Sequence, residues 1–235
     1  MPADQPSNVA AWAEVDEFLR QALSGRSDIE RYSSDALAAS RAAGLPDIAV
    51  TPSQGKMLML LARACRCRHV LEVGTLGGYS TLWFAEAVGV NGKVVTLEVD
   101  HEHARIAAEN FARTGYGGRI DLRVGPALET LPQLAREVGA GKGAPFDLTF
   151  IDADKASTAE YLRWAVRLSR PGAVIVIDNA VRGGAVADER NRDASVAGIR
   201  QALHVIASEP GLTASALQTV GAKGHDGFIM AVVEG

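Results

Sequence analysis

The spacing of apolar residues divides the chain into two parts. Up to about residue 66, apolar residues recur every three to four positions, which predicts three amphipathic helices over residues 10–23, 27–44 and 51–65. The third helix has a clear start signal, because Thr51 can act as its N-cap and Pro52 fits the first helical position. The first part of the chain is therefore predicted to be helical.

From His69 onward, short apolar runs alternate with helical patterns. The runs lie at residues 69–73, 93–99, 120–124, 146–151 and 173–178. Nearly continuous Val, Ile and Leu between helices indicates a parallel sheet that is covered on both faces, which is a doubly wound α/β fold.

Two segments depart from this alternation. Apolar residues 216–220 and 227–235 are separated only by "GAKGHDG", which is too short for a crossover helix, so they are expected to pair as an antiparallel hairpin at one sheet edge. The polar segment 181–194 is longer than a typical connection and is expected to form a mobile loop over a site.

Composition narrows the class of protein. The chain has 235 residues, of which 47% are hydrophobic, and this supports a single domain with a helical cap (1–66) and an α/β core (67–235). A net charge of −4 with scattered basic residues argues against nucleic acid as a partner. Because no leader pattern or long apolar run is present, we expect a soluble cytoplasmic protein that does not bind membranes. Cys65 and Cys67 are too few for a disulfide framework or a zinc site, and we expect them to be inert.

The stretch "LEVGTLGGYS" follows the first predicted strand and opens a helix. Its glycines, Gly74, Gly77 and Gly78, allow a tight turn and close approach of a ligand. The spacing G-x-x-G-G does not match the dinucleotide fingerprint G-x-G-x-x-G, which makes a pyrophosphate-binding role less favoured. A close strand-to-helix turn that binds no ligand is the alternative interpretation.

Two glutamates sharpen the interpretation of this glycine-rich turn. Glu72 would repel a pyrophosphate but could engage an ammonium group, directly or through water. Glu98 ends the second strand, where a carboxylate can accept hydrogen bonds from both hydroxyls of a ribose. Together they suit S-adenosylmethionine, a nucleoside with a cationic amino-acid tail. Asp100 fits a helix N-cap better than a ligand-binding role.

A second group of polar residues follows the fourth and fifth strands. Asp152 ends the fourth strand, and Asp178 and Asn179 end the fifth. If these strands are neighbours, their ends lie about 5 Å apart, and three oxygen ligands converge that suit Mg²⁺ or Ca²⁺. The alternative is that Asp178 and Asn179 cap the next segment while Asp152 pairs with Lys155.

The histidines make weaker candidates for metal ligands. His101 and His103 are two positions apart on a helix, so they point to different faces and make a poor metal pair. His225 lies in a glycine-rich turn and is expected to be a plain turn residue, although it could approach the site.

Several motifs in order along the chain resemble one family. "LEVGTLGGYS", "TLEVD", "GPALETLP", "FIDADK", "RPGAVIVIDN" and "TVGAKGHDGF" are similar to the cation-dependent class I S-adenosylmethionine O-methyltransferases, a group related to caffeoyl-CoA and catechol O-methyltransferases. The resemblance runs from about Val50 to the C-terminus. It implies a seven-stranded Rossmann-like sheet in the order 3-2-1-4-5-7-6 with the last strand antiparallel, and extra N-terminal helices.

The resemblance also implies roles for individual residues. The cofactor S-adenosylmethionine would lie over the first two strands, with Glu98 on its ribose. Its other contacts would be Val50, Glu72, Gly74, Thr75 and Ser80 around the methionine part, Ala127 near the adenine, and Asp152 and Asp154 on the amino-acid side. The metal ligands would be Asp152, Asp178 and Asn179, and Lys155 would be the general base.

The predicted activity is methyl transfer to a phenolic acceptor. Two adjacent hydroxyls of a catechol-type acceptor would bind a divalent cation, Mg²⁺ by preference or Ca²⁺ or Mn²⁺, and Lys155 would take or relay the phenolic proton. An NAD-dependent oxidoreductase on a similar sheet and a noncatalytic cofactor-binding protein are the alternatives. The resemblance also implies a homodimer.

Overall fold

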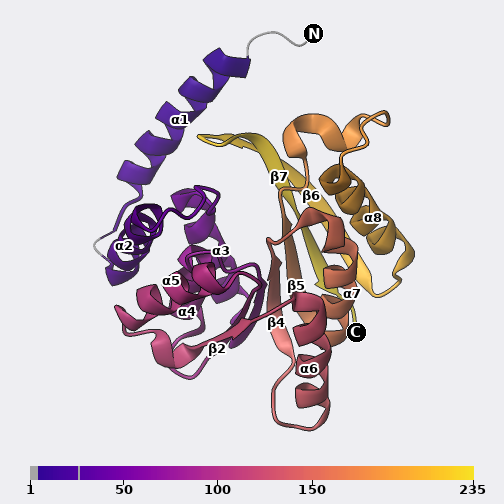
Figure 1. Ribbon diagram of the computed structural model, residues 1–235. Coiled ribbons are helices and arrows are strands. Elements are labelled where there is room, and N and C mark those ends of the chain that lie inside the picture. Colours follow the sequence, from indigo (N-terminus) through magenta and orange to yellow (C-terminus); the bar gives the residue numbers. More distant parts are fainter. Residues whose placement is uncertain (1–4, 26) are drawn as a thin grey trace.

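The computed structural model describes residues 5–25 and 27–235, and it contains a seven-stranded sheet between two layers of helices (Figure 1). The strand order is β3-β2-β1-β4-β5-β7-β6, which confirms the predicted topology. The strands are β1 (His69–Val73), β2 (Lys93–Glu98), β3 (Ile120–Val124), β4 (Phe146–Ile151), β5 (Ser169–Asp178), β6 (Leu212–Gly221) and β7 (Gly224–Val233).

Helices cover both faces of this sheet (Figure 1). They are α1 (Gln5–Ala22), α2 (Asp28–Ala42), α3 (Pro52–Ala64), α4 (Tyr79–Val88), α5 (His101–Ala112), α6 (Ala127–Gly139), α7 (Thr158–Leu168) and α8 (Ala194–Ser208), with 3-10 turns η1 (Gly117–Arg119), η2 (Lys155–Ser157) and η3 (Arg182–Ala187). One apolar cluster joins the sheet to α6, α7 and α8, and another joins it to α2, α3, α4 and α5. The N-terminal helices α2 and α3 are therefore part of the core.

The helix starts follow the sequence signals. The Gln54 amide donates to Thr51 Oγ1 at 3.2 Å at the start of α3, where Pro52 occupies the first helical position. Asp100 Oδ1 accepts from the amides of Glu102 and His103 at the start of α5. Both predicted N-caps are confirmed.

The C-terminal hairpin is longer than its sequence suggests. β7 is antiparallel to both β5 and β6, as predicted, but most of the expected loop "GAKGHDG" belongs to the strands. Only Ala222 and Lys223 lie between the strands, and Gly224 takes the left-handed φ of +90° that a tight hairpin needs. The prediction of a seven-residue loop is wrong because strand pairing continues through these polar positions.

The segment 181–194 is organised by one arginine. It forms η3, in which Gly183 and Gly184 have positive φ, and a following turn. The guanidinium of Arg200 donates to the carbonyls of Ala185, Val186, Asp188 and Asn191. The expected irregular loop is therefore partly helical, and its mobility stays a prediction.

The first helix lies at the edge of the molecule, where it contacts β6 and α3 (Figure 1). Its middle contacts the tip of the β6–β7 hairpin, where the Ala222 amide donates to Asp16 Oδ2 at 2.8 Å. The side chains of Val15, Phe18 and Leu19 are exposed, and Phe18 is 70% exposed. Among the described residues, no helix is both long and apolar enough to cross a bilayer.

Candidate active site

The predicted functional residues gather at the carboxyl edge of the sheet. Val73 on β1 is paired with Leu97 on β2 and with Ile151 on β4, and Ile151 is paired with Ile177 on β5. The residues that follow these four positions are Gly74, Glu98, Asp152 and Asp178, and parallel pairing brings them to the same edge. The site is built on rigid strand ends.

The glycine-rich turn is packed against protein on every side where a side chain would project. A Cβ at Gly74 would lie 2.2 Å from the Asp152 carbonyl oxygen, and one at Gly77 would lie 2.0 Å from Ser40 Oγ. A Cβ at Gly78 would lie 2.3 Å from the ring of Phe111. The glycines are therefore required by the protein's own packing, as the alternative interpretation supposed, and this packing brings the turn against the strand end at Asp152.

Glu98 organises the turn from the end of β2. Its Oε2 atom accepts from the amides of Thr75 at 3.2 Å and Leu76 at 2.7 Å, and its Oε1 atom accepts from the Asp100 amide at 2.9 Å. Leu76 has a left-handed φ of +50°. Because a carboxylate has about four acceptor positions, Glu98 can still accept a further donor.

Glu72 is fully buried, and only one of its two carboxylate oxygens has hydrogen-bond partners. Its Oε2 atom accepts from the hydroxyls of Thr81 and Thr96, the latter at 2.6 Å, whereas its Oε1 atom has no hydrogen-bond partner. Burial raises the pKa of the Glu72 carboxyl to about 7, and the nearby hydroxyls of Ser80, Thr81 and Thr96 oppose that shift. An unpaired, buried carboxylate oxygen is costly, and a cationic group placed beside it would offset that cost.

Two carboxylates and one ammonium meet at the ends of β4 and β5. Lys155, which is 8% exposed, donates from Nζ to Asp152 Oδ1 at 2.8 Å. Burial and the nearby charge of Asp152 raise the pKa of Asp178 to about 6, and the Lys155 charge opposes the shift. Asn179 directly follows Asp178 with a left-handed φ of +55°, which asparagine tolerates better than most residues. The predicted Asp152–Lys155 pair is thus present, and the convergence of Asp152, Asp178 and Asn179 on one metal ion stays a prediction.

Comparisons with known proteins agree with this geometry. The family model described as O-methyltransferase matches residues 32–230. A catechol O-methyltransferase of Mycobacterium tuberculosis is 50% identical over 220 residues, which cover 94% of this chain and 95% of that protein. A catechol O-methyltransferase of Niastella koreensis is 46% identical, with 88% and 94% covered. The crystal structure of an O-methyltransferase from Bacillus cereus in complex with SAH has a TM-score of 0.90 and 45% identity, with 96% and 100% covered.

The chain belongs to the O-methyltransferase family. It is therefore an enzyme that uses S-adenosylmethionine, the methyl donor whose demethylated product is SAH. Of the three functions that the sequence allowed, methyl transfer is confirmed, and the oxidoreductase and the noncatalytic binding protein are set aside. The glycine spacing and Glu72 are the sequence features that disfavour the oxidoreductase.

The other residues predicted to hold the cofactor of this O-methyltransferase come from four different parts of the chain. Val50 is buried in the segment before α3, and Ser80 is buried in the first turn of α4. Ala127 begins α6 beyond the end of β3. Asp154 accepts from the Ser157 amide at 3.0 Å and from the Tyr161 hydroxyl at 2.5 Å, which makes it the N-cap of η2. The contacts of these four residues with the cofactor stay predictions.

The histidines and cysteines of the O-methyltransferase lie outside this cluster or have other partners. His103 Nδ1 lies 3.8 Å from Glu98 Oε1, and His225 Nε2 lies 2.9 Å from Gln218 Oε1 across the hairpin. Cys65 and Cys67 are free thiols, and burial raises the pKa of Cys67 to about 12. A thiol with so high a pKa is a poor nucleophile, in agreement with the expectation that this cysteine is inert.

The structure adds two residues that the sequence did not indicate. Gln54, in the first turn of α3, is close enough to Asp178 for its side chain to lower the pKa of that carboxyl. Lys223, at the hairpin tip, donates to the carbonyl of Ala49. Partial burial lowers the pKa of Lys223, and the charges of Asp47, Asp152 and Asp178 oppose that shift. No local motif marks either residue, because each reaches the site from a distant part of the chain.

Proposed function

We propose that this enzyme is a divalent-metal-dependent O-methyltransferase whose acceptor is a small aromatic molecule with two adjacent hydroxyls. The observation that carries the proposal is the pair Asp152 and Asp178, which end neighbouring strands beside the Lys155 ammonium. The glycine-rich turn of the cofactor side touches the same strand end, since Gly74 packs against Asp152. A methyl donor and a chelated acceptor could therefore meet across one strand end.

The donor set fits a hard divalent cation. Within the part of the chain that the structure describes, no three His, Cys, Asp or Glu side chains gather into a metal site, so a third protein ligand has to be a neutral oxygen. Asn179 offers one beside Asp178, and the resulting set of two carboxylates and an amide suits Mg²⁺, or else Ca²⁺ or Mn²⁺. When bound, such a cation supplies Lewis-acid polarisation of the acceptor hydroxyls.

The cofactor would be held by groups that are already in place. Glu98 keeps acceptor capacity for a ribose hydroxyl, and the unpaired Glu72 Oε1 offers a counter-charge to the ammonium of the methionine part. Val50, Thr75 and Ser80 would surround that methionine part. Alignment of two bound reactants can correspond to roughly 7–11 kcal/mol of the barrier, which makes this rigid framework useful for catalysis.

Lys155 is proposed as the general base. Its ammonium is oriented by Asp152 Oδ1 at 2.8 Å, and its backbone is held from behind by α8. A Cβ at Gly198 of α8 would lie 1.9 Å from the Lys155 carbonyl oxygen, so only glycine allows this approach. In its neutral form Lys155 would take the proton of the reacting hydroxyl, and the oxygen would then attack the methyl group of the sulfonium.

A methyl-transfer screen tests the proposal. Catechol and other 1,2-dihydroxy acceptors should be methylated in the presence of Mg²⁺, whereas resorcinol, a matched 1,3-diol, should not. Addition of EDTA should abolish product formation, and excess Mg²⁺ should restore it. Equal turnover of the two diols, or turnover that is insensitive to the chelator, would contradict the proposed acceptor or the proposed metal.

We also propose that the enzyme forms a homodimer through α1. The exposed residues Val15, Phe18 and Leu19 form one apolar stripe on this helix, and Leu60 of α3 is 54% exposed. Large exposed apolar side chains in one stripe are typical of protein–protein contacts. Light scattering should give twice the chain mass for the wild type and the chain mass for Phe18→Glu. A wild-type protein that stays monomeric at micromolar concentration would contradict the dimer.

A further inference from the structure

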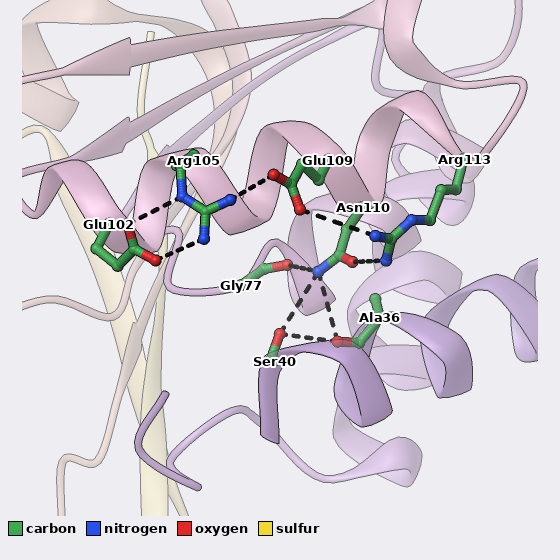
Figure 2. A network of polar contacts seen from close by, with 8 residues as sticks. All are labelled: Ala36, Ser40, Gly77, Glu102, Arg105, Glu109, Asn110 and Arg113. Atoms are coloured by element: carbon green, nitrogen blue, oxygen red, sulfur yellow. Dashed lines mark hydrogen bonds and ion pairs between the residues drawn. The ribbon is translucent and has the colours of Figure 1, made fainter. Parts of the chain in front are cut away.

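A buried amide ties the glycine-rich turn to two helices (Figure 2). Asn110 of α5 is 3% exposed, and its Nδ2 atom donates to the Gly77 carbonyl at 2.9 Å. The same nitrogen lies 3.4 Å from the Ala36 carbonyl and 3.5 Å from Ser40 Oγ, both on α2. One side chain therefore contacts the turn and the N-terminal helices at the same point.

The shortest of these contacts is the one to the turn. The two contacts to α2 are at the limit of hydrogen-bond length, and Ser40 Oγ already donates to the Ala36 carbonyl at 2.7 Å. The Oδ1 atom of Asn110 accepts from Arg113 at 3.3 Å on the outer side (Figure 2). Of the contacts of Asn110, the one to the Gly77 carbonyl should cost the most free energy when it is removed, because a buried carbonyl without a partner is costly.

The turn needs support on this side. Its other end is held by Glu98, which accepts from the amides of Thr75 and Leu76. Leu76 supplies one of these amides and directly precedes Gly77. Its left-handed φ of +50° is unfavourable for a leucine. Such a conformation persists where its surroundings hold it in place. Glu98 and Asn110 therefore hold the turn by hydrogen bonds to the backbone on either side of this residue.

We propose that Asn110 is a positioning residue for S-adenosylmethionine, which acts by holding the Gly77 carbonyl and thereby the ligand-binding form of the glycine-rich turn. The inference rests on the proposed location of the cofactor over this turn. Asn110 itself lies behind the turn, in the interface of α5 with α2, and it acts on cofactor affinity through the Gly77 backbone.

The test uses Asn110→Asp, which keeps the shape of the side chain and removes the N–H donor. SAH binding is measured by calorimetry without acceptor or metal, so the result does not depend on the proposed acceptor chemistry. The Kd for SAH should rise by about tenfold or more at pH 8, because the hydrogen bond is lost and an ionised carboxylate then faces the Gly77 carbonyl oxygen. The kcat at saturating S-adenosylmethionine should stay within about twofold of wild type, because the lost interaction stabilises the ground state and the transition state equally.

A pH series separates positioning from general loosening of the fold. A protonated aspartic acid regains an O–H donor, so the ratio of the variant's Kd to the wild-type Kd should shrink as pH falls from 8 to 6. Thr114→Val is the matched control, since it deletes a hydrogen bond just beyond the end of α5, to the Phe111 carbonyl at 2.8 Å, and leaves the contacts of Asn110 in place. This control should lower Tm and leave the Kd unchanged.

Two results would overturn the inference. One is an SAH Kd for Asn110→Asp within twofold of Thr114→Val at every pH. The other is a loss that does not vary with pH relative to wild type, which a purely structural role would give. If Asn110→Asp does not fold, Asn110→Ser, whose hydroxyl is too short to reach Gly77, gives the comparison of its SAH Kd with that of Thr114→Val at pH 8. A wild-type enzyme that fails to bind SAH would instead reject the proposed cofactor site.

Discussion

The two halves of the site solve the problem of buried charge differently. On the cofactor side, the Glu98 carboxylate accepts three backbone amides, and Glu72 accepts two threonine hydroxyls. On the β4–β5 side, Asp152 and Asp178 face each other across neighbouring strands, and burial together with this repulsion raises the pKa of Asp178 to about 6. On the cofactor side the protein satisfies both oxygens of Glu98 and one oxygen of Glu72, whereas on the β4–β5 side two like charges share one ammonium, Lys155.

Substitutions in the two halves of the site are therefore expected to have different effects. Where the protein satisfies its own polar groups, a substitution should loosen a preformed framework and weaken cofactor binding. Where like charges are crowded together, a substitution should relieve repulsion and stabilise the protein even as it removes activity. Such trade between stability and activity is common at functional sites.

The largest effect is expected from Asp178→Asn. If Asp178 is a metal ligand, kcat with saturating Mg²⁺ should fall on the order of 10³-fold. A bound cation stabilises the transition state by several kcal/mol, and this stabilisation would be lost with the cation. In EDTA, however, the variant should have a higher Tm than wild type above pH 6, because a buried charge beside Asp152 is gone. Thermal unfolding and initial rates measure both quantities.

The exposed Asp188 provides a control for this variant, and Asp188→Asn should change neither quantity. A variant Asp178→Asn with lowered Tm and full activity would reverse the comparison between the two halves. Asp152→Ala is a less clean test, since it also removes the partner of Lys155.

A smaller effect is expected from Lys155→Met. Loss of a general base should lower kcat by about 10²–10⁴-fold, and the Kd for SAH should stay within twofold because the ammonium lies on the acceptor side. The remaining activity should rise steeply with pH as the acceptor hydroxyl ionises in solution. A pH–rate profile parallel to that of wild type would remove Lys155 from the proton transfer, and Lys142→Met at the exposed α6–β4 connection is the control.

The smallest effect is expected from Glu72→Gln and concerns stability. The pKa of Glu72 is raised from 4.5 to about 7 by burial, so the folded cofactor-free protein binds this proton more tightly than the unfolded chain. Its contribution to the free energy of unfolding is therefore greatest below pH 4.5 and declines as pH rises to about 7. Urea denaturation of Glu72→Gln from pH 4.5 to 8.5 should lack this decline, and identical slopes for both proteins would show that Glu72 does not titrate there.

The sequence predicts some parts of the molecule better than others. The sheet and the strand-end residues follow from local signals, since apolar runs define the strands and the polar residues come directly after them, whereas the strand order follows from the family resemblance. The same signals misplace the hairpin loop, because pairing between β6 and β7 overrides the turn chemistry of "GAKGHDG". Gln54, Asn110 and Lys223 could not be found in this way, because each acts on residues at least 33 positions away in the chain.

The order of the strands has a consequence for how the enzyme is made. β7 is the last strand to leave the ribosome, yet it pairs with β5 through Val174–Asp178 and separates β5 from β6. Until its residues emerge, the strand that carries Asp178 has an unpaired edge, and such edges invite association with other chains. A nascent or truncated chain that lacks Gly224–Val233 should therefore be prone to aggregation, and activity should appear only after synthesis is complete.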